Sequence, residues 1–283
     1  MSNLKIGVLV DSFKLGIKDG LAKAAEVGAK GVQMYAVKGE MAPENMTADK
    51  VKEIKDMVAS NGLVISAICG DLGGGGFMRP EDNAWKVEKS KRIMDLSLEL
   101  GCNIITTHIG IVPSEENERM EIMRATCSEL AEYGDSVGAH FAIETGPEEA
   151  HTLKAFLESL SGKAVGVNFD PANLVMVHGV NAAESFKVLA PYVVHTHAKD
   201  GNLITKTNPE CIYGDLRHEL IAGVKYFEEV PLGEGGVNFD EYLAAVKACG
   251  WEGFLTIERE CGENPVEDIT KAVKFLENKL SVL

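Results

Sequence analysis

The sequence repeats one pattern along its length: short apolar runs rich in β-branched residues alternate with longer segments of helical character. The apolar runs lie at 4–10, 31–36, 63–69, 103–109, 139–144, 164–169, 193–198 and 253–258. Eight runs in 283 residues leave about 35 residues for each strand and its helix, which is the repeat of a (β/α)8 barrel. Strands joined by such helices pair in parallel, and closing eight of them removes both free sheet edges. The pattern therefore predicts an α/β fold of the TIM barrel type.

An open, doubly wound sheet is the alternative that the same alternation allows. The turn after the first expected strand reads LVDSFKLG and lacks the GxGxxG pattern of dinucleotide-binding sheets, which favours the barrel. The segment 80–101 carries helix signals, because it begins with Pro80 and two acidic residues and ends at Gly101. No linker, low-complexity tract or charge block divides the chain, so residues 1–283 are expected to form one barrel domain.

The charge balance limits the partners. Asp and Glu total 43 against 28 Lys and Arg, which gives a formal net charge of −15. Such a surface repels phosphate backbones and anionic membranes, so neither nucleic acid nor a membrane is an expected partner. The six cysteines are scattered without a CxxC pair, and the N-terminal apolar run is too short for a signal peptide. These features predict free thiols and a cytoplasmic location.

Two connections are longer than the others, at 70–80 and 199–238. The first reads GDLGGGGFMRP and leaves the carboxyl end of an expected strand. Four consecutive glycines indicate either a flexible surface loop or a hinged lid that covers a substrate.

Metal-ligand side chains stand at the carboxyl ends of four consecutive expected strands: Glu144, Asp170, His197 and Glu258. Barrel enzymes build their sites at these ends, so we expect the four to converge. Three converging carboxylates repel one another, and burying them costs several kcal/mol unless a cation compensates. Three oxygen donors and one imidazole suit one divalent metal ion, with Mn²⁺, Mg²⁺ or Co²⁺ favoured and Zn²⁺ possible.

The seventh strand aims two imidazoles at one face, because His195 and His197 are two residues apart. His197 is expected at the height of the metal ligands. His195 should lie about 6.6 Å deeper in the barrel, where a structural, hydrogen-bonded role is favoured.

Other side chains are candidates for substrate binding. His108 ends the fourth strand and could bind substrate, add a fifth ligand or bond only a backbone carbonyl. Lys199 could bind substrate or pair with Glu144 or Glu258, and Asp200 is expected to cap a helix or loop.

The long second connection contains GDLRHE, which places Arg217 and His218 within possible reach of a substrate carboxylate or phosphate. A solvated loop position is the alternative for both residues.

Together the motifs FAIETG, VNFDPANL, HTHAKD, PLGEGGVNF and LTIERE resemble the xylose isomerase-like barrel superfamily, the sugar phosphate isomerase/epimerase group. The resemblance implies that Glu144, Asp170, His197 and Glu258 bind one divalent metal ion. It also implies that Glu144 and Glu258 are catalytic and move protons. The expected activity is isomerisation or epimerisation of a sugar or sugar phosphate by proton transfer beside a carbonyl. The analogy further implies a homo-oligomer that acts on a small polyol or sugar.

The sequence departs from parts of this resemblance. Asn173 stands where ketose 3-epimerases have a histidine. The third strand ends ICGDLGG without a histidine, and no Asp-x-His precedes LGEGG, which argues against an endonuclease-type phosphodiester hydrolase. A metal-dependent dehydratase of an inosose or keto acid remains the nearest alternative, because it shares the enediolate-like step. A catalytically silent binding barrel is a third possibility.

Overall fold

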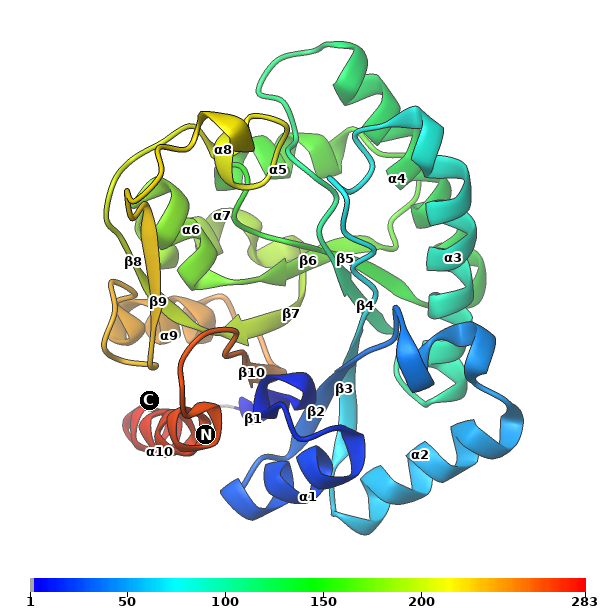
Figure 1. Ribbon diagram of the computed structural model, residues 1–283, viewed down its shortest axis with the longest axis vertical. Coiled ribbons are helices and arrows are strands. Elements are labelled where there is room, and N and C mark those ends of the chain that lie inside the picture. The colour runs from blue at the N-terminus through cyan, green and yellow to red at the C-terminus, as the bar shows by residue number, and fades with distance from the viewer. Residues whose placement is uncertain (1–2) are drawn as a thin grey trace.

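The computed structural model describes residues 3–283, and its central feature is a closed barrel of parallel strands. Around the barrel the strand order is β1-β10-β7-β6-β5-β4-β3-β2 (Figure 1). The strands are β1 (Lys5–Leu9), β2 (Gly31–Tyr35), β3 (Val64–Cys69), β4 (Ile104–Thr107), β5 (His140–Glu144), β6 (Val165–Phe169), β7 (Val193–Ala198) and β10 (Phe254–Ile257). The predicted (β/α)8 barrel is confirmed.

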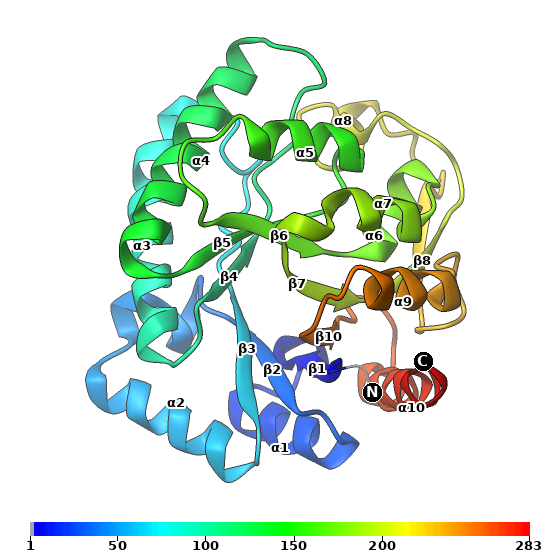
Figure 2. The same cartoon turned by 180° about the vertical axis from the view of Figure 1, so that it is seen from behind.

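Helices surround the barrel on its outer side, as the views from both faces show (Figures 1 and 2). They are α1 (Ile17–Val27), α2 (Ala48–Ser60), α3 (Pro80–Glu99), α4 (Glu118–Val137), α5 (Ala150–Glu158), α6 (Pro171–His178), α7 (Ala182–Leu189), α9 (Phe239–Ala248) and α10 (Pro265–Val282). Short 3-10 turns are η1 (Val10–Phe13), η2 (Gly39–Met41), η3 (Pro43–Asn45) and η4 (Ala190–Tyr192). None of the helices in residues 3–283 has the length and apolar character needed to cross a membrane.

Local sequence signals set the helix boundaries. Thr47 and Asn117 each accept a hydrogen bond from a backbone N–H in the first turn of α2 and α4. Helix α4 ends on Gly138 in the left-handed conformation, which costs glycine little. The first turns of α2 and α4 and the end of α4 are thus fixed by residues that the sequence itself supplies.

The long connection after β7 holds a hairpin that the sequence pattern did not reveal. Strands β8 (Asp200–Leu203) and β9 (Phe227–Val230) pair in antiparallel register outside the barrel. Between them lies an excursion, residues 204–226, with α8 (Pro209–Ile212) and η5 (Arg217–Glu219). Figure 1 shows this yellow segment beside the barrel mouth.

Asp200 fixes the base of this hairpin. Its Oδ2 atom accepts hydrogen bonds from the backbone N–H groups of Gly233 (2.9 Å) and Gly235 (3.0 Å). Its Oδ1 atom accepts from Val237 at 3.1 Å. The glycine-rich PLGEGG stretch is thus a loop wrapped around one buried carboxylate, in agreement with the expected capping role.

Candidate metal centre and active site

Four acidic and imidazole side chains meet at the carboxyl end of the barrel. Each of Glu144, Asp170, His197 and Glu258 offers one ligand atom, and these atoms all lie within 4.8 Å of one another. Glu144 is the last residue of β5, His197 lies in β7, and Asp170 and Glu258 directly follow β6 and β10. All four are buried. The structure therefore brings together the set that the sequence analysis proposed.

The three carboxylates surround one nitrogen atom of His197. Its Nδ1 lies 3.5 Å from Glu144 Oε1, 3.4 Å from Asp170 Oδ2 and 3.4 Å from Glu258 Oε2. Tetrahedral ligands about 2.1 Å from one metal ion lie about 3.4 Å apart. His197 Nδ1 and Asp170 Oδ2 are also buried without a hydrogen-bond partner. A divalent metal ion would satisfy both atoms, so the donor set fits such an ion.

The electrostatics of the cluster favour a positive charge at this point. Burial by itself lowers the pKa of His197, but the carboxylates of Glu258 and Glu144 raise it well above its usual value. Burial raises the pKa of Glu258, yet His197 and Lys199 reverse this effect and hold it well below its usual range. The Glu258 carboxylate thus remains ionised and attracts a cation.

The other nitrogen of His197 is held by a residue that the sequence analysis missed. His197 Nε2 lies 2.9 Å from Gln33 Oε1, and Gln33 Nε2 donates to Thr106 Oγ1 at 2.8 Å. An Nε2–H that donates to Gln33 fixes the imidazole ring so that Nδ1 is the nitrogen atom that faces the carboxylates. One signal was available, because Gln33 is a polar residue within the apolar run GVQMYA.

Asparagine side chains orient Glu144. Asn173 Nδ2 donates to Glu144 Oε1 at 3.0 Å, and Asn168 Nδ2 donates to Oε2 at 3.3 Å. Asn168 Oδ1 lies 2.9 Å from His195 Nδ1, and His195 Nε2 lies 3.0 Å from Thr256 Oγ1. His195 therefore belongs to a buried hydrogen-bond network below the cluster, which agrees with its expected structural role.

The two carboxylate oxygen atoms of Asp170 have different roles. As the N-cap of α6, its Oδ1 accepts from the backbone N–H groups of Ala172 (2.8 Å) and Asn173 (3.0 Å). Oδ2 is left for the cluster. The helix start thus fixes the direction of the carboxylate.

Lys199 pairs with Glu258, which is one of the alternatives left open by the sequence. Its Nζ donates to Glu258 Oε2 at 2.9 Å and also to Glu260. Only 3% of Lys199 is exposed. The lysine is therefore a buried cation directly behind one proposed metal ligand.

His108 is oriented by Asp71, a second residue that the sequence analysis missed. Its Nδ1 lies 3.1 Å from Asp71 Oδ2, and its Nε2 lies 3.8 Å from Glu144 Oε1 without a hydrogen-bond partner. Burial lowers the pKa of His108, but Glu144 and Asp71 together raise it to about 10. The Tyr213 ring stacks on His108 with 5.7 Å between centroids.

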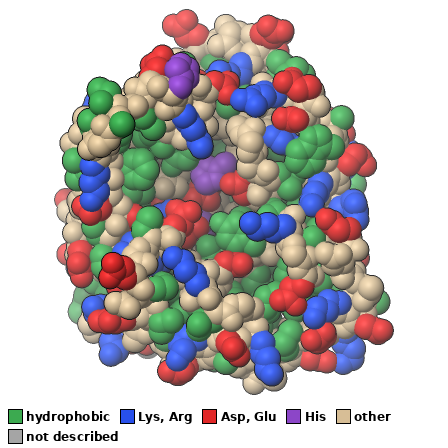
Figure 3. All heavy atoms as spheres, viewed as in Figure 1, with side chains coloured by type: hydrophobic (Ala, Val, Ile, Leu, Met, Phe, Trp, Pro, Cys, Tyr) green, Lys and Arg blue, Asp and Glu red, His purple; other side chains and the backbone are tan. Residues whose placement is uncertain are grey.

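A cavity of 150 Å³ lies over the cluster. It is lined by three side chains of the cluster, Glu144, His197 and Glu258, and by Gln33, Tyr35, Cys69, Asp71, His108, Asn173, Lys199, Tyr213 and Glu260. Figure 3 shows the hollow near the centre of this face, with histidine and acidic side chains inside it. Tyr213 closes one side from the excursion, so this part of the site could not be read from strand ends.

Arg217 and His218 lie elsewhere. Both are exposed on η5 and are absent from the lining of the cavity. Tyr213, which lies four residues before Arg217 in the excursion, lines the cavity instead. Their placement supports the solvated alternative rather than contact with a substrate.

The glycine-rich loop 70–80 is held against the barrel. Lys86 from α3 is 2% exposed, and its Nζ donates to the carbonyls of Gly73 (3.2 Å), Gly74 (3.4 Å) and Gly76. Gly76 has a φ of 61°, and a Cβ there would lie 1.9 Å from the carbonyl carbon of Ile109. Arg79 also pairs with Asp215 of the excursion. The two long connections therefore meet beside the cavity.

The sequence of the chain matches a known family over most of its length. Residues 21–279 match the family model described as xylose isomerase-like TIM barrel. An uncharacterized protein of Methanocaldococcus jannaschii is 22% identical over 70% of this chain and 63% of that protein. An inosose dehydratase of Clostridium botulinum is 24% identical over 54% of this chain and 50% of that protein. The chain thus spans less than two thirds of these curated relatives.

Solved structures share the whole fold. A xylose isomerase domain protein from Planctomyces limnophilus has a TM-score of 0.80 and 26% identity, over 98% of this chain and 97% of that chain. The probable 3-DHS dehydratase AsbF of Bacillus anthracis has a TM-score of 0.74 and 20% identity, over 96% and 98%. A D-tagatose 3-epimerase-like protein has a TM-score of 0.74 and 19% identity, over 98% of this chain and 97% of that chain. At this identity the last two similarities show the fold alone.

Proposed function

Because the chain belongs to the xylose isomerase-like TIM barrel family, we propose that it is a divalent-metal-dependent isomerase or epimerase of a sugar or sugar phosphate. The reaction would move a proton at a carbon next to a carbonyl group. The observation that carries the proposal is the convergence of three carboxylates on the unpartnered Nδ1 atom of His197.

A divalent cation bound by Glu144, Asp170, His197 and Glu258 would supply Lewis-acid stabilisation of negative charge on substrate oxygen atoms. Glu144 and Glu258 face the cluster from β5 and the end of β10, with β6 and β7 between them. One carboxylate can accept the proton beside the carbonyl, and the other can return it to carbon. Lys199 and Asn173 hold these two carboxylates in position.

The cavity favours a compact substrate. Its 150 Å³ is close to the volume of an engineered cavity of about 150 Å³ that admits benzene. Tyr213 and the stacked His108 form part of its wall. A small polyol or single sugar matches this space better than an oligosaccharide.

A metal-dependent dehydratase is the second candidate, and His108 favours it. Its Nε2 is unpartnered and faces the cluster, while Asp71 bonds its other nitrogen. A protonated imidazole in this place can donate to a departing β-hydroxyl. Similarity to the inosose dehydratase and the presence of Asn173 at the histidine position of ketose 3-epimerases also support this alternative.

Isotope exchange separates the two reactions. The purified protein would first be analysed for bound metal, then incubated in D₂O with ketoses, inososes and hydroxy-keto acids. Deuterium beside the carbonyl without loss of water is the expected result for the isomerase or epimerase. Release of water identifies the dehydratase. Both candidate reactions are contradicted if the protein binds no divalent metal ion. They are also contradicted if Glu258→Gln binds the tested ketoses, inososes and hydroxy-keto acids as the wild type does.

A further inference from the structure

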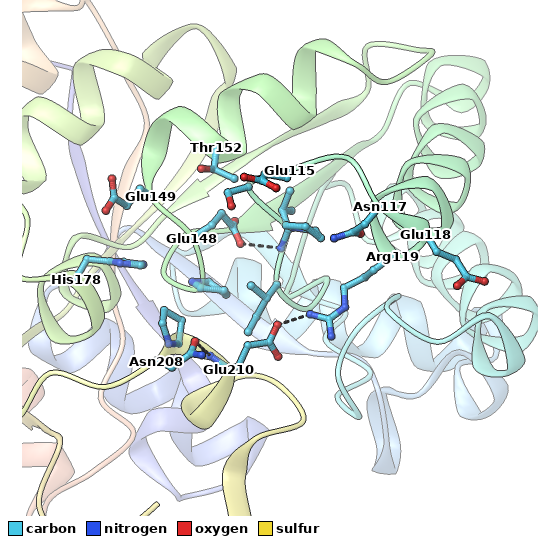
Figure 4. Close-up of a pocket in the computed structure, with 16 residues that line it drawn as sticks. Glu115, Asn117, Glu118, Arg119, Glu148, Glu149, Thr152, His178, Asn208 and Glu210 are labelled. Atoms are coloured by element: carbon cyan, nitrogen blue, oxygen red, sulfur yellow. Dashed lines mark hydrogen bonds and ion pairs between the residues drawn. The ribbon is translucent and has the colours of Figure 1, made fainter. Parts of the chain in front are cut away.

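A second and larger cavity lies on the same rim as the metal cluster, with a volume of 890 Å³. We call it the outer cavity. Most residues of 111–119 after β4 line it, together with 147–149 and Thr152 after β5, His178 of α6 and 208–210 at α8 (Figure 4). It shares no lining residue with the cavity over the cluster. Its volume falls within the range of small-molecule sites, roughly 300–1,000 Å³.

The wall of the outer cavity carries an excess of negative charge. Its lining includes the side chains of five glutamates, Glu115, Glu118, Glu148, Glu149 and Glu210. Burial raises the pKa of Glu148 to about 8, so this carboxyl group carries its full charge only in alkaline solution. Arg119 is the one lysine or arginine in that lining, and it pairs with Glu210. His178 adds little positive charge at neutral pH, because burial lowers its pKa more than the Gly146 carbonyl oxygen, 3.0 Å from its Nε2, raises it. A cationic ligand is therefore favoured over an anionic one.

Glu148 supplies the point of attachment. It is 6% exposed, its Oε2 accepts a hydrogen bond from the Val112 N–H at 3.2 Å, and its Oε1 has no partner. Figure 4 shows its side chain projecting from the β5–α5 loop into the ring of lining residues. A buried carboxylate oxygen without a donor is costly, and a charged N–H donor would offset that cost.

The arrangement of these side chains favours an organic cation over a metal ion as the ligand. In the part of the chain that the structure describes, the cluster around His197 is the one group whose ligand atoms converge on a single point. The carboxylates of the outer cavity are spread around it instead. Between them stand the apolar side chains of Ile111, Val112 and Pro209, and the polar groups of Ser114 and Thr152. Such a wall suits a carbon skeleton with hydroxyl groups.

We propose that the outer cavity binds a small aminated polyol, whose primary ammonium group donates to Glu148 and whose hydroxyl groups contact the polar wall. This site is separate from the metal cluster. Gly146 and Tyr213 stand between the two cavities, where a Cβ on Gly146 would lie 3.1 Å from the Tyr213 hydroxyl. The proposal does not depend on which reaction occurs at the cluster.

Calorimetric titration of the Mg²⁺-loaded protein tests this site. The probes are 1-amino-1-deoxyglucitol and glucitol, which differ by the ammonium group, at pH 8.5, above the pKa of Glu148. We expect the amine to bind at least tenfold more tightly than glucitol. Glu148→Gln should weaken binding of the amine at least tenfold, whereas Glu263→Gln, which removes an exposed carboxylate elsewhere, should leave it unchanged.

Two further variants keep the test decisive. Thr152→Arg places a cation in the outer cavity without altering Glu148, and it should also abolish binding of the amine. Glu258→Gln should not affect that binding, and thermal unfolding checks that each variant is folded. Equal affinity for the two probes, full affinity in folded Glu148→Gln, or loss of binding only in Glu258→Gln would overturn the proposal.

Discussion

Single hydrogen bonds decide how the side chains of the cluster present their ligand atoms. His197 can offer Nδ1 because Gln33 occupies Nε2, and Asp170 can offer Oδ2 because α6 occupies Oδ1. In metal sites the groups that hold a ligand often matter nearly as much as the ligand itself. The orientation of each ligand is thus a property of its neighbours.

Replacing Gln33 tests whether it orients His197 for metal binding. Gln33→Met removes the acceptor for His197 Nε2 but keeps a similar volume. We expect metal affinity to fall about 10–100-fold, the usual effect of losing such a partner. Titration of the metal-free protein with Mn²⁺ measures it. The control is Gln33→Glu, which restores an acceptor; affinity unchanged in the methionine variant would exclude the orienting role.

Glu148 predicts a pH dependence of stability. Burial raises its pKa to about 8 from an ordinary 4.5. Between these values the folded protein binds more protons than the unfolded chain, so this carboxyl lowers stability as pH rises through that window. Glu148→Gln should therefore be more stable than wild type, by up to a few kcal/mol. The difference should grow from pH 5 to pH 8 and then level off.

Urea unfolding at several pH values measures this difference. Glu149→Gln is the matched control, because Glu149 is the exposed neighbour in the same loop. A stability difference for Glu148→Gln that stays constant from pH 5 to pH 8 would contradict the raised pKa.

At the scale of elements, the site is closed by two connections rather than by the barrel. The loop 70–80 brings Asp71, and the excursion 204–226 brings Tyr213. The ion pair between Arg79 and Asp215 joins the two connections, and the pair between Arg119 and Glu210 ties α8 to the start of α4. The exposed pair between Arg79 and Asp215 contributes little stability, roughly 0–1 kcal/mol, so it does not by itself fix the two connections to each other.

Lys86 fixes the position of the glycine-rich loop. Lys86→Met keeps the buried aliphatic stem but leaves the carbonyls of Gly73, Gly74 and Gly76 without their cation. We expect a loss of about 1–3 kcal/mol of stability and faster amide exchange in residues 70–80. Hydrogen exchange followed by mass spectrometry checks this. Lys89→Met, which breaks a surface pair with Glu44, should not speed exchange in the loop.

At the scale of the whole molecule, the cluster couples metal binding to folding. Its four side chains come from strands across half of the barrel, so they converge only in the folded state. A metal ion at 100 times its dissociation constant then stabilises the fold by about 2.7 kcal/mol. We expect Mn²⁺ or Mg²⁺ to raise the unfolding temperature and a chelator to reverse the rise.

Glu258→Gln supplies the comparison for this experiment. The variant removes one ligand charge, so the metal-dependent rise should be lost or strongly reduced. A rise of the same size in the variant would show that the ion acts elsewhere on this acidic surface.

The amino-acid sequence determined the barrel and the four converging side chains, because both follow from residue patterns within single strands. The period of each strand and the polar residue at its end are readable without knowing any partner. Tertiary structure decided the rest. Gln33 is 164 residues from His197, and Asp71 is 37 residues from His108, so nothing local links either pair. Tyr213, rather than Arg217 or His218, covers the cavity because the path of the excursion depends on its packing against the folded barrel.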